Sequence, residues 1–505
     1  MDEAERLLER LVRKEPRNFA ALHLLGVISI QRQEFERGAE LITRSISLFP
    51  NDAFAHRNLG IALICMKRFE PSLASLDRGI ALEPPLADAH YNRGVALSAL
   101  GRFDEALASY DRAIALDANY VEAHENRGLA LNELMRPEKA LASLDRAVAL
   151  RPQMASAHYN RGIVLNELMR YGDAVASYDR AIALRPEFAD AHWNKSLSLL
   201  LRGNWENGWR LYEWRKKAPE YVVSRTHIRP DWTGDAKIKG ATLFVHSEQG
   251  LGDTIQFCRY ALLAEAAGAK VILATQGTLT RLLHGLSPTL DIVGSDAVPA
   301  AFDYHAALMS MPLAFGTTEE NIPRMVPYLH AEPDRVREWG GRIGAHGFKV
   351  GICWQGNKRA SADVGRSFPL AQFRDISKIA GVRLISLQKG AGNEQLLDLP
   401  AGMTVEVLGD ELDAGPDAFL DTAAVMQSLD LVITADTSIA HLGGALARPT
   451  WVVLKHVPDW RWQLSRADSP WYPTLRLFRQ KRSGDWNGAF DEIAHALIAQ
   501  TETLK

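Results

Sequence analysis

The chain has 505 residues, of which 47% are apolar and 24% are charged, a balance typical of globular proteins with about three ordinary domains. Lys and Arg total 58 against 61 Asp and Glu, so the net charge of -3 gives no strong field that would favour nucleic acid or an anionic membrane surface. The sequence contains no run of about 18 apolar residues, so no membrane span is predicted. The N-terminus lacks the apolar core of a signal peptide. The cysteines, Cys65, Cys258 and Cys353, lack metal-ligand spacing and favour a reducing compartment, so we expect a cytoplasmic protein.

Residues 1–215 repeat with a period of 34 residues. The recurring positions are His56, His90, His124, His158 and His192, and Gly60, Gly94, Gly128 and Gly162. Proline recurs with the same period and ends the second helix of each pair, because it lacks a backbone N–H. The glycines let the two helices of a pair approach closely. The pattern resembles the tetratricopeptide repeat, which implies an α-solenoid over residues 1–215.

Five asparagines, which we call the asparagine ladder, stand two residues before each glycine position of the repeat. They are Asn58, Asn92, Asn126, Asn160 and Asn194. Because an amide carries donors and an acceptor, such a row can hold an extended peptide backbone. It resembles the asparagine ladder of the protein O-linked N-acetylglucosamine transferases, which implies a polypeptide partner in the concave groove. The alternative is that Asn is simply common at this site, and the first full repeat has Leu24 there.

Periodicity fades after Gly203. Aromatic residues at helical spacing (Trp205, Trp209, Tyr212 and Trp214) predict a packed joint between two modules. The segment Pro230-Asp231-Trp232-Thr233-Gly234 then ends any helix, so we expect a linker over residues 216–240.

From Ala241 onwards, short apolar runs alternate with helical segments. Thr242–His246 predicts a buried strand, the loop EQGLGD and a helix to about Ala267 follow, and Lys270–Ala274 predicts a second strand. A further series of strands is expected at residues 350–354, 383–387, 404–407, 431–434 and 450–454. Repeated βαβ units predict parallel sheets, hence two Rossmann-like lobes, residues 241–340 and 341–505, with a ligand crevice beyond the strand ends.

The string ADTSIAHLGGALARPTWVVL, which begins at Ala435, joins a strand to a helix N-terminus. It resembles the glycosyltransferases of the heptosyltransferase type, which have the GT-B fold, although Ser438 replaces the usual Gly. The resemblance implies an inverting, metal-independent enzyme in which Thr437, Ser438 and the helix end bind the diphosphate of a nucleotide-sugar. His441 would reach the same phosphates, and Asp436 would orient the turn or bind sugar hydroxyls. The alternatives are an ordinary N-cap and a core histidine.

The string EQGLGDTIQF contains the candidate catalytic residue. The family has its suspected general base at the Asp that follows this glycine turn, which is Asp253 here. The alternative is a capping box between Asp253 and Gln256, three residues later. Capping and catalysis are compatible, because a capping carboxylate lies at the rim of the crevice.

The loop WQGNKRASADVGRSFP follows the first strand of the second lobe. In relatives this loop supplies a Lys or Arg to the leaving diphosphate, so Lys358 and Arg366 are both candidates. Further donor-site candidates are Gln355, Gly356 and Asn357, through their backbone, and Gln388 and Lys389, as nucleoside contacts. No Asp-x-Asp motif sits at a strand end, so neither a metal ion nor a cofactor is expected. We expect residues 457–473 to pack beneath the crevice; the alternative is that Trp460 or Trp462 stacks on a sugar or base. A last helix, about 487–499, is expected to cross back onto the first lobe.

The leading hypothesis is transfer of a sugar from a nucleotide-sugar to a protein Ser or Thr held by the repeat arm, with flagellin or another surface protein as the acceptor. A second hypothesis changes the acceptor to a lipid-linked or polysaccharide sugar. A third is a non-catalytic protein–protein interaction scaffold. The sequence leaves the sugar, the nucleotide, the acceptor and the oligomeric state open.

Overall fold

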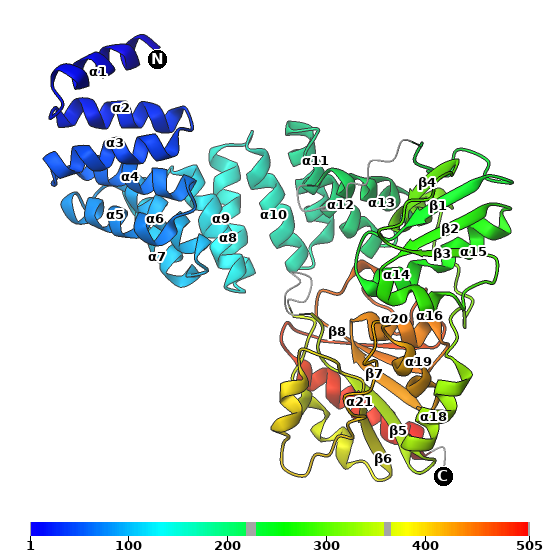
Figure 1. The fold of residues 1–505 in the computed structure, drawn as a ribbon. Helices are drawn as coiled ribbons and strands as arrows, with labels where there is room; N and C mark the ends of the chain where they lie inside the picture. Colours follow the sequence, from blue (N-terminus) through cyan, green and yellow to red (C-terminus); the bar gives the residue numbers. More distant parts are fainter. Residues whose placement is uncertain (1, 219–228, 358–364, 503–505) are drawn as a thin grey trace. The chain divides into compact units, whose positions relative to one another are not determined.

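The computed structural model describes residues 2–218, 229–357 and 365–502 (Figure 1). The chain divides into two compact units, Met1–Ala191 and His192–Lys505. In the described ranges, no helix is both long enough and apolar enough to cross a membrane.

The first unit is built from antiparallel helix pairs, as the 34-residue period predicts. Its helices are α1 (Asp2–Lys14), α2 (Phe19–Gln31), α3 (Phe35–Leu48), α4 (Ala53–Cys65), α5 (Phe69–Leu82), α6 (Ala87–Ala99), α7 (Phe103–Leu116), α8 (Val121–Glu133), α9 (Pro137–Leu150), α10 (Ala155–Glu167) and α11 (Tyr171–Leu184). Each pair packs on the next, and α12 (Ala189–Leu201) crosses the boundary between the units. The predicted solenoid is confirmed.

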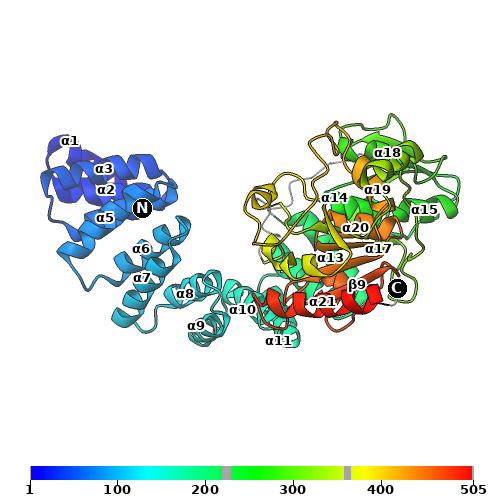
Figure 2. The ribbon, with the colours of Figure 1, turned by 90° about the horizontal axis from the view of Figure 1, so that it is seen from below.

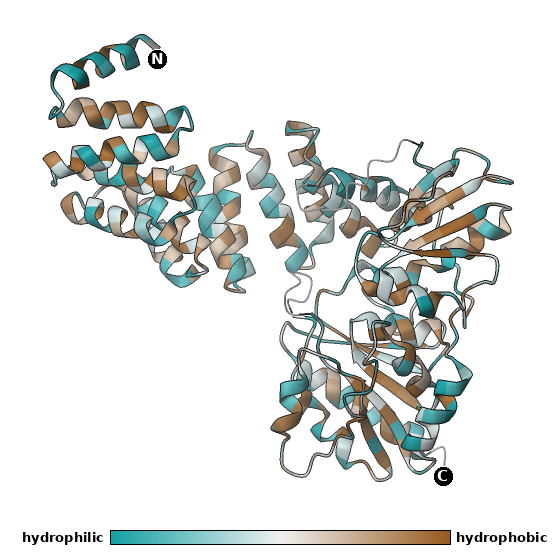
Figure 3. Cartoon of the chain, in the orientation of Figure 1, coloured by the Kyte–Doolittle hydropathy of each residue, from teal (hydrophilic) through white to brown (hydrophobic). Residues whose placement is uncertain are grey.

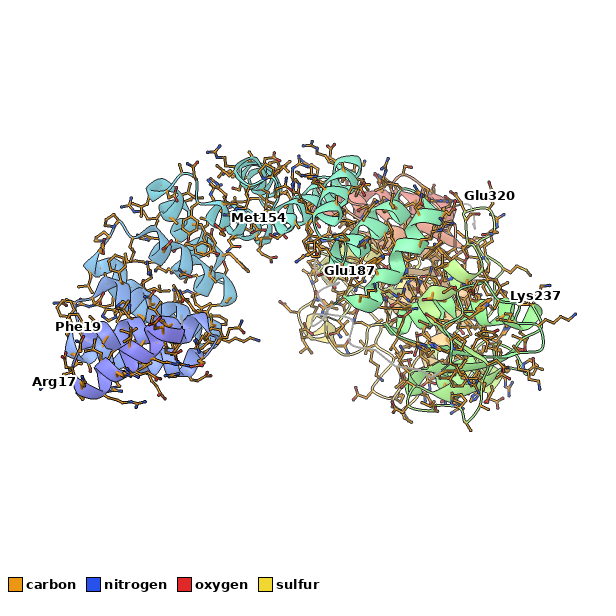
Figure 4. All side chains as sticks on the ribbon, turned by 90° about the horizontal axis from the view of Figure 1, so that it is seen from above. Arg17, Phe19, Met154, Glu187, Lys237 and Glu320 are labelled. Carbon is orange, nitrogen blue, oxygen red and sulfur yellow. The ribbon has the colours of Figure 1, made fainter. Side chains whose placement is uncertain are left out.

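The repeated histidines have a structural role that their spacing alone did not reveal. His56, His90 and His158 each contact the carbonyl oxygen of the proline six residues earlier through Nε2, at 3.0 Å. A carbonyl only accepts, so Nε2 carries the proton in each ring. These bonds fasten the turn before the first helix of a pair to that helix; Figure 4 labels Met154 in one such turn, before α10.

Arginines one residue before the glycines connect successive repeats. Arg127 on α8 donates through Nε to Asp111 of the preceding repeat (2.5 Å) and through Nη1 to Ser143 of its own repeat (2.5 Å). Arg93 and Arg161 make the equivalent pairs of bonds. Neighbouring repeats are therefore joined by a periodic polar network in addition to their apolar core.

The glycine positions mark close helix contacts. A Cβ atom added at Gly162 would lie 2.5 Å from Cε1 of Tyr178, and one added at Gly94 would lie 2.5 Å from Cε1 of Tyr110. Both tyrosine rings are almost completely buried. Since no real Cβ fits at that distance, the glycine of the first helix is what admits the large residue of the second.

We expect Gly162→Ala to lower the free energy of unfolding by about 1–3 kcal/mol, because the added methyl group overpacks the contact with Tyr178. Gly172, on the adjacent helix α11, is the matched control, because a Cβ added there would have no atom within 4 Å. Gly172→Ala should leave stability unchanged or raise it by up to about 1 kcal/mol. Urea unfolding of both variants makes the comparison, and equal losses would contradict the packing account.

The second unit begins with an aromatic joint. Trp205 and Trp209 on α13 (Trp205–Tyr212) contact Trp460 at ring-centroid distances of 6.5 and 5.2 Å, and Trp205 also contacts Trp471 at 6.0 Å. The 3₁₀ turn η1 (Glu213–Lys217) follows. The predicted aromatic packing forms, and all of these tryptophans belong to the second unit. The repeat-based expectation carried the arm on to residue 215, but these aromatic contacts place residues 205–217 with the second unit.

The first sheet of this unit has four parallel strands in the order β3-β2-β1-β4. They are β1 (Thr242–His246), β2 (Lys270–Thr275), β3 (Asp291–Gly294) and β4 (Tyr304–Ala307). The connecting helices are α14 (Leu251–Phe257), α15 (Arg259–Ala266), α16 (Thr280–Leu283) and α17 (Met311–Ala314), with the 3₁₀ turns η2 (Gly277–Leu279) and η3 (Leu308–Ser310). The single helix expected to reach Ala267 is divided at Cys258 into α14 and α15.

The second sheet has five parallel strands in the order β6-β5-β7-β8-β9. They are β5 (Phe348–Cys353), β6 (Val382–Ser386), β7 (Leu431–Ala435), β8 (Thr450–Leu454) and β9 (Leu475–Arg479). The helices are α18 (Pro333–Ile343), α19 (Leu420–Gln427), α20 (Ser438–Ala445) and α21 (Trp486–Glu502), and the 3₁₀ turns are η5 (Leu370–Arg374), η6 (Ile376–Lys378), η7 (Asn393–Leu397) and η8 (Trp460–Trp462). The strand order reverses between β5 and β7, where ligands bind in doubly wound sheets.

The apolar strands of both sheets are evident in Figure 3, and β7 and β8 are buried throughout. The prediction of a strand at residues 404–407 is wrong, because this segment forms only one isolated bridge, between Ile385 and Glu406. The α/β character of the second unit is confirmed.

The terminal helix differs from the expectation. Phe490, Ile493 and Leu497 of α21 are buried in the core of the second sheet, with Phe368 and Phe373 among their neighbours. Figure 2 shows α21 beside β9, with which it packs. The expected crossing back onto the first lobe is therefore wrong, because the apolar face of this helix completes the core of the second lobe.

Candidate functional site

A cavity of about 520 Å³ lies at the carboxyl ends of β5, β6 and β7, at the point where the strand order reverses. Its wall contains seven of the predicted donor-site residues: Gln355, Gly356, Asn357, Gln388, Lys389, Thr437 and Ser438. The first lobe contributes Leu251 and Thr278, and the loop before α19 contributes residues including Asp413 and Phe419. Its volume lies in the range of small-molecule sites. The structure therefore brings most of the predicted donor site together.

The N-terminus of α20 forms one side of this cavity. Thr437 is the N-cap, and its Oγ1 accepts a hydrogen bond from Ile439 N–H at 3.3 Å. Thr437 and Ser438 are partly exposed and line the cavity. A helix N-terminus presents N–H groups and the positive end of its dipole, which together favour an anion. The sequence predicted correctly that a helix N-terminus lies at Thr437 and Ser438.

Two predicted nucleoside contacts instead support the cavity wall. Gln388 Oε1 accepts hydrogen bonds from Trp354 N–H (3.1 Å) and Gln355 N–H (3.0 Å), while its Nε2 donates to the carbonyl oxygens of Gln355 (2.9 Å) and Ala391 (2.8 Å). Lys389 Nζ donates to the carbonyl oxygens of Leu412 and Asp413. The polar groups of both side chains are bonded to the backbone, so these two residues stabilise the shape of the cavity wall.

The backbone of the loop after β5 is similarly occupied. Gly356 N–H donates to Ser367 Oγ at 3.0 Å, and Gln355 N–H is held by Gln388. The sequence predicted that these two N–H groups bind phosphates. In the structure, both already donate to other residues of the protein. Lys358 lies outside the described residues.

Asp436 and His441 lie behind the cavity wall, with 7% and 5% of their surfaces exposed. Burial is the main cause that raises the pKa of Asp436 from 3.8 to about 6; Asp459 adds to the rise, and Arg366 opposes it. Arg366 is thus close enough to Asp436 to influence its charge, although it lies outside the cavity wall. A carboxyl with a raised pKa beside a cavity is a feature common at functional sites.

His441 is a core histidine in this structure and is not among the residues that line the cavity, where the phosphates are predicted to bind. Its ring stacks on Trp462 at 5.5 Å, and Nδ1 is 3.1 Å from Tyr472 Oη. Burial is the main cause that lowers the pKa of His441 well below 6.5, and Arg461 adds to this. The neutral ring packs against Gly252, where an added Cβ would lie 3.0 Å from it, so His441 joins the two lobes.

We expect Asp436→Asn to raise the free energy of unfolding by roughly 1–3 kcal/mol at pH 7 and to have little effect at pH 4. The folded-state pKa of Asp436 is raised. The folded state therefore binds more protons than the unfolded state between about pH 4 and pH 6, and stability falls as pH rises through that window. Urea unfolding at both pH values measures the difference. The exposed Asp491→Asn on α21 is the control, and an equal gain at both pH values would contradict the prediction.

Asp253 lies at the start of α14, outside the cavity wall and two residues from Leu251, which lines it. Its Oδ2 accepts a hydrogen bond from Gly250 N–H at 2.9 Å, and its Oδ1 forms an ion pair with Arg461 of the second lobe. The side chain is 22% exposed. The N-cap of α14 is therefore Gly250, and Asp253 at the third helical position bonds back to it. The expected capping box between Asp253 and Gln256 is wrong.

Arg461 is a residue of the site that the sequence did not predict. Its side chain is 9% exposed and bonds Asp253, Asp459 Oδ1 (2.9 Å) and Gln256 Oε1 (2.8 Å), while its guanidinium lies 4.5 Å from the centre of the Trp460 ring. Arg461 thus connects both lobes next to the candidate base. Its position between two tryptophans was the one feature of the sequence that could have pointed to it. The packing expected for this segment is confirmed, because Trp460, Trp462 and Trp471 are all buried.

The asparagine ladder is partly exposed along its whole length, and its amides bond to protein groups. Asn126 Nδ2 donates to Tyr91 Oη (3.1 Å) and Asn160 Nδ2 to Glu125 Oε1 (2.9 Å), each on the preceding repeat. Asn58 Nδ2 contacts His23 Nε2 (2.9 Å), and Asn92 bonds within its own helix. Asn194 belongs to the second unit. The amide N–H groups are thus partly committed to joining repeats.

No metal site is apparent in the described part of the chain: it contains no group of three or more His, Cys, Asp or Glu side chains that could hold a metal ion.

Comparisons with known proteins agree with the repeat geometry. Models of the tetratricopeptide repeat match residues 87–120 and 155–188, and a second such model matches residues 1–53. The first unit is therefore a tetratricopeptide-repeat solenoid, followed by an α/β module with parallel sheets.

Protein FlbA of Caulobacter vibrioides is 28% identical over 328 residues, covering 59% of this chain and 53% of FlbA. The chain thus spans about half the length of this relative. Because 59% of 505 residues exceeds the 191 residues of the first unit, the match extends into the second. Two solved structures are also similar to this chain: pilF of Pseudomonas aeruginosa (18% identity, TM-score 0.37, 41% of this chain and 95% of that chain) and a thermophilic tetratricopeptide-repeat protein of Thermus thermophilus (22%, 0.31, 36% and 99%).

Proposed function

We propose that the protein is an inverting glycosyltransferase that uses a nucleotide-sugar. The observation that carries the proposal is the 520 Å³ cavity at the strand-order reversal, with the N-terminus of α20 in its wall. Parallel sheets bind nucleotides at this position, and a helix N-terminus favours their phosphates. The resemblance of the string from Asp436 to His441 to heptosyltransferase-type enzymes supports the same ligand.

The proposed reaction needs a base and a stabilised leaving group. The acceptor hydroxyl oxygen forms a bond to the anomeric carbon while the bond from that carbon to the diphosphate oxygen breaks, which inverts the configuration. The electron pair leaves with the nucleoside diphosphate, whose charge is stabilised by the N-terminus of α20 and by a basic residue of the loop after β5, for which Lys358 and Arg366 are the candidates. Asp253 takes the hydroxyl proton. Its carboxylate is held by Gly250 and Arg461 and remains 22% exposed.

We further propose that the acceptor is a polypeptide Ser or Thr, because the same chain carries a tetratricopeptide-repeat unit. Repeats of this kind form extended concave surfaces suited to protein partners. The partly exposed ladder residues Asn58, Asn92, Asn126 and Asn160 are the proposed contacts. The amide nitrogens of Asn92, Asn126 and Asn160 already donate within the protein, so the proposed contact uses their carbonyl oxygens, which accept from the acceptor's backbone N–H groups. The carbonyl oxygen of Asn58 already accepts from Arg57 Nε (3.2 Å) and Nη2 (3.0 Å), so Asn58 contributes less to this contact.

The test combines the purified chain with sugar-labelled UDP-, GDP-, ADP-, dTDP- and CMP-sugars and a cell lysate. Label that migrates with a polypeptide supports the full proposal. Label found only in glycolipid or polysaccharide keeps the transferase and replaces the acceptor. If no sugar is transferred and no nucleotide raises the thermal stability of the chain, the transferase proposal fails and the protein-interaction scaffold remains.

A further inference from the structure

A directed series of hydrogen bonds ends at Gln355 in the cavity wall. The donor Leu370 N–H bonds to Gln395 Oε1 at 2.8 Å, so the other end of the Gln395 amide, Nε2, is fixed as a donor. Gln395 Nε2 then donates to Gln355 Oε1 at 3.3 Å. Because a backbone N–H starts the series, both amide orientations are determined by the network. Gln355 therefore turns Nε2, a donor, away from Gln395.

This donor has no partner in the part of the chain that the structure describes. Gln355 lines the cavity and is 5% exposed, and its Nε2 is buried without a hydrogen-bond acceptor. Buried polar groups are almost always paired, so an orphan donor at a cavity indicates that another molecule supplies the acceptor.

The backbone of Gln355 is held rigidly in place. Gln388 accepts from its N–H at 3.0 Å and donates to its carbonyl oxygen at 2.9 Å. The side chain is therefore presented by a residue that is fixed on both sides, and little conformational freedom is lost when a ligand binds.

The loop that carries Gln355 and the N-terminus of α20 line the same cavity. Cys353 of β5 pairs with Thr434 of β7, so the loops that carry Gln355 and Ser438 leave adjacent strands. Cys353 Sγ and Thr437 Oγ1 are 4.0 Å apart, and Gln355, Thr437 and Ser438 line the same cavity. The Gln355 side chain and the first turn of α20 thus border one cavity, and hydrogen-bond donors around a cavity favour an oxygen-rich anion.

We infer that the side-chain Nε2 of Gln355 donates a hydrogen bond to a phosphate oxygen of the bound nucleotide. The inference rests on the proposed function and extends it. The sequence predicted that Gln355 binds the nucleotide-sugar through its backbone, whereas the contact inferred here is made by its side chain. Gln395 is then a positioning residue, because it sets which end of the Gln355 amide faces the ligand.

The experiment measures binding of UDP, ADP, GDP and dTDP, and of the matching nucleosides without phosphate, by calorimetry. Gln355→Met keeps the shape and removes the donor, and we expect it to weaken nucleoside diphosphate binding by about 10-fold to 100-fold. Gln355→Glu replaces the donor by a carboxylate and should weaken it further. Nucleoside binding should change less than about 2-fold in both variants, because the lost contact is to phosphate.

Controls separate the alternatives. Gln372→Glu adds the same charge outside the cavity wall and should leave binding unchanged, and thermal unfolding of each ligand-free variant checks its folding. Equal diphosphate affinity in the wild type and Gln355→Met overturns this inference alone. A parallel loss of nucleoside and diphosphate affinity also overturns it, in favour of a purely structural role. If the wild-type chain binds none of the diphosphates, the nucleotide-dependent function and this inference both fail.

Discussion

Asp253→Asn is expected to reduce the turnover number of sugar transfer by about 100-fold to 10,000-fold, the range that positioned general bases supply. The asparagine carbonyl oxygen can still accept the Gly250 N–H bond that caps α14. It cannot take the acceptor's proton. Asp253 lies outside the wall of the 520 Å³ cavity, so nucleoside diphosphate affinity should stay within about 2-fold of the wild-type value. Turnover and calorimetric affinity are measured on the same preparation.

Asp235→Asn provides the control, since Asp235 is an exposed carboxylate before β1 of the same lobe and its loss should leave turnover unchanged. Retention of more than half of the wild-type turnover by Asp253→Asn would show that another group acts as base. The buried Asp436, whose pKa is raised to about 6, is then the next residue to test.

Arg461→Met should lower the free energy of unfolding of the second unit by about 3 kcal/mol, the scale found when one member of a buried ionic network is removed. The methionine removes the guanidinium from three acceptors at once: Asp253, Asp459 and the fully buried Gln256. Asp253 and Asp459 each keep one bond from a backbone N–H, so the loss at Gln256 Oε1 is the most costly. Arg461→Lys retains the charge but lacks the planar fork that reaches all three, so an intermediate loss is expected. Urea unfolding followed by tryptophan fluorescence measures both variants.

Arg337→Met is the matched control for this prediction. Arg337 pairs with Asp334 on the surface of α18, with side chains 74% and 89% exposed, and such pairs contribute little. Its replacement should change stability by less than about 1 kcal/mol. If both methionine variants lost the same stability, burial of the Arg461 network would not be the cause.

The repeat architecture could be predicted from the sequence because each structural requirement recurs at one spacing. Gly162 must be small where Tyr178 packs, and the proline or its equivalent ends each second helix. Central strands such as β7 and β8 were predicted because they are apolar throughout. The strands β3, β4 and β9 were not predicted, because all three lie at sheet edges, where exposed or partly exposed residues interrupt the apolar pattern.

The location of the site was more predictable than the role of each residue. Residues that directly follow parallel strands meet at one sheet edge, so Gln355, Gln388 and Ser438 came together as expected. Their hydrogen-bond partners depend on loops that no local pattern specifies. The Gln388 amide bonds to the backbone of Trp354, Gln355 and Ala391. The amide nitrogen of Gln355 has no acceptor among the residues that the structure describes. Sequence spacing cannot distinguish these two glutamines.

The tryptophans of α13 decide where the chain can be shortened. Trp205 and Trp209 contact Trp460, and the second compact unit starts at His192. A fragment that began at the first strand, near residue 241, would leave Trp460 and Trp471 without these aromatic neighbours and would expose apolar surface beside Arg461. Isolation of the α/β module as a stable domain therefore requires that about fifty residues before its first strand be retained.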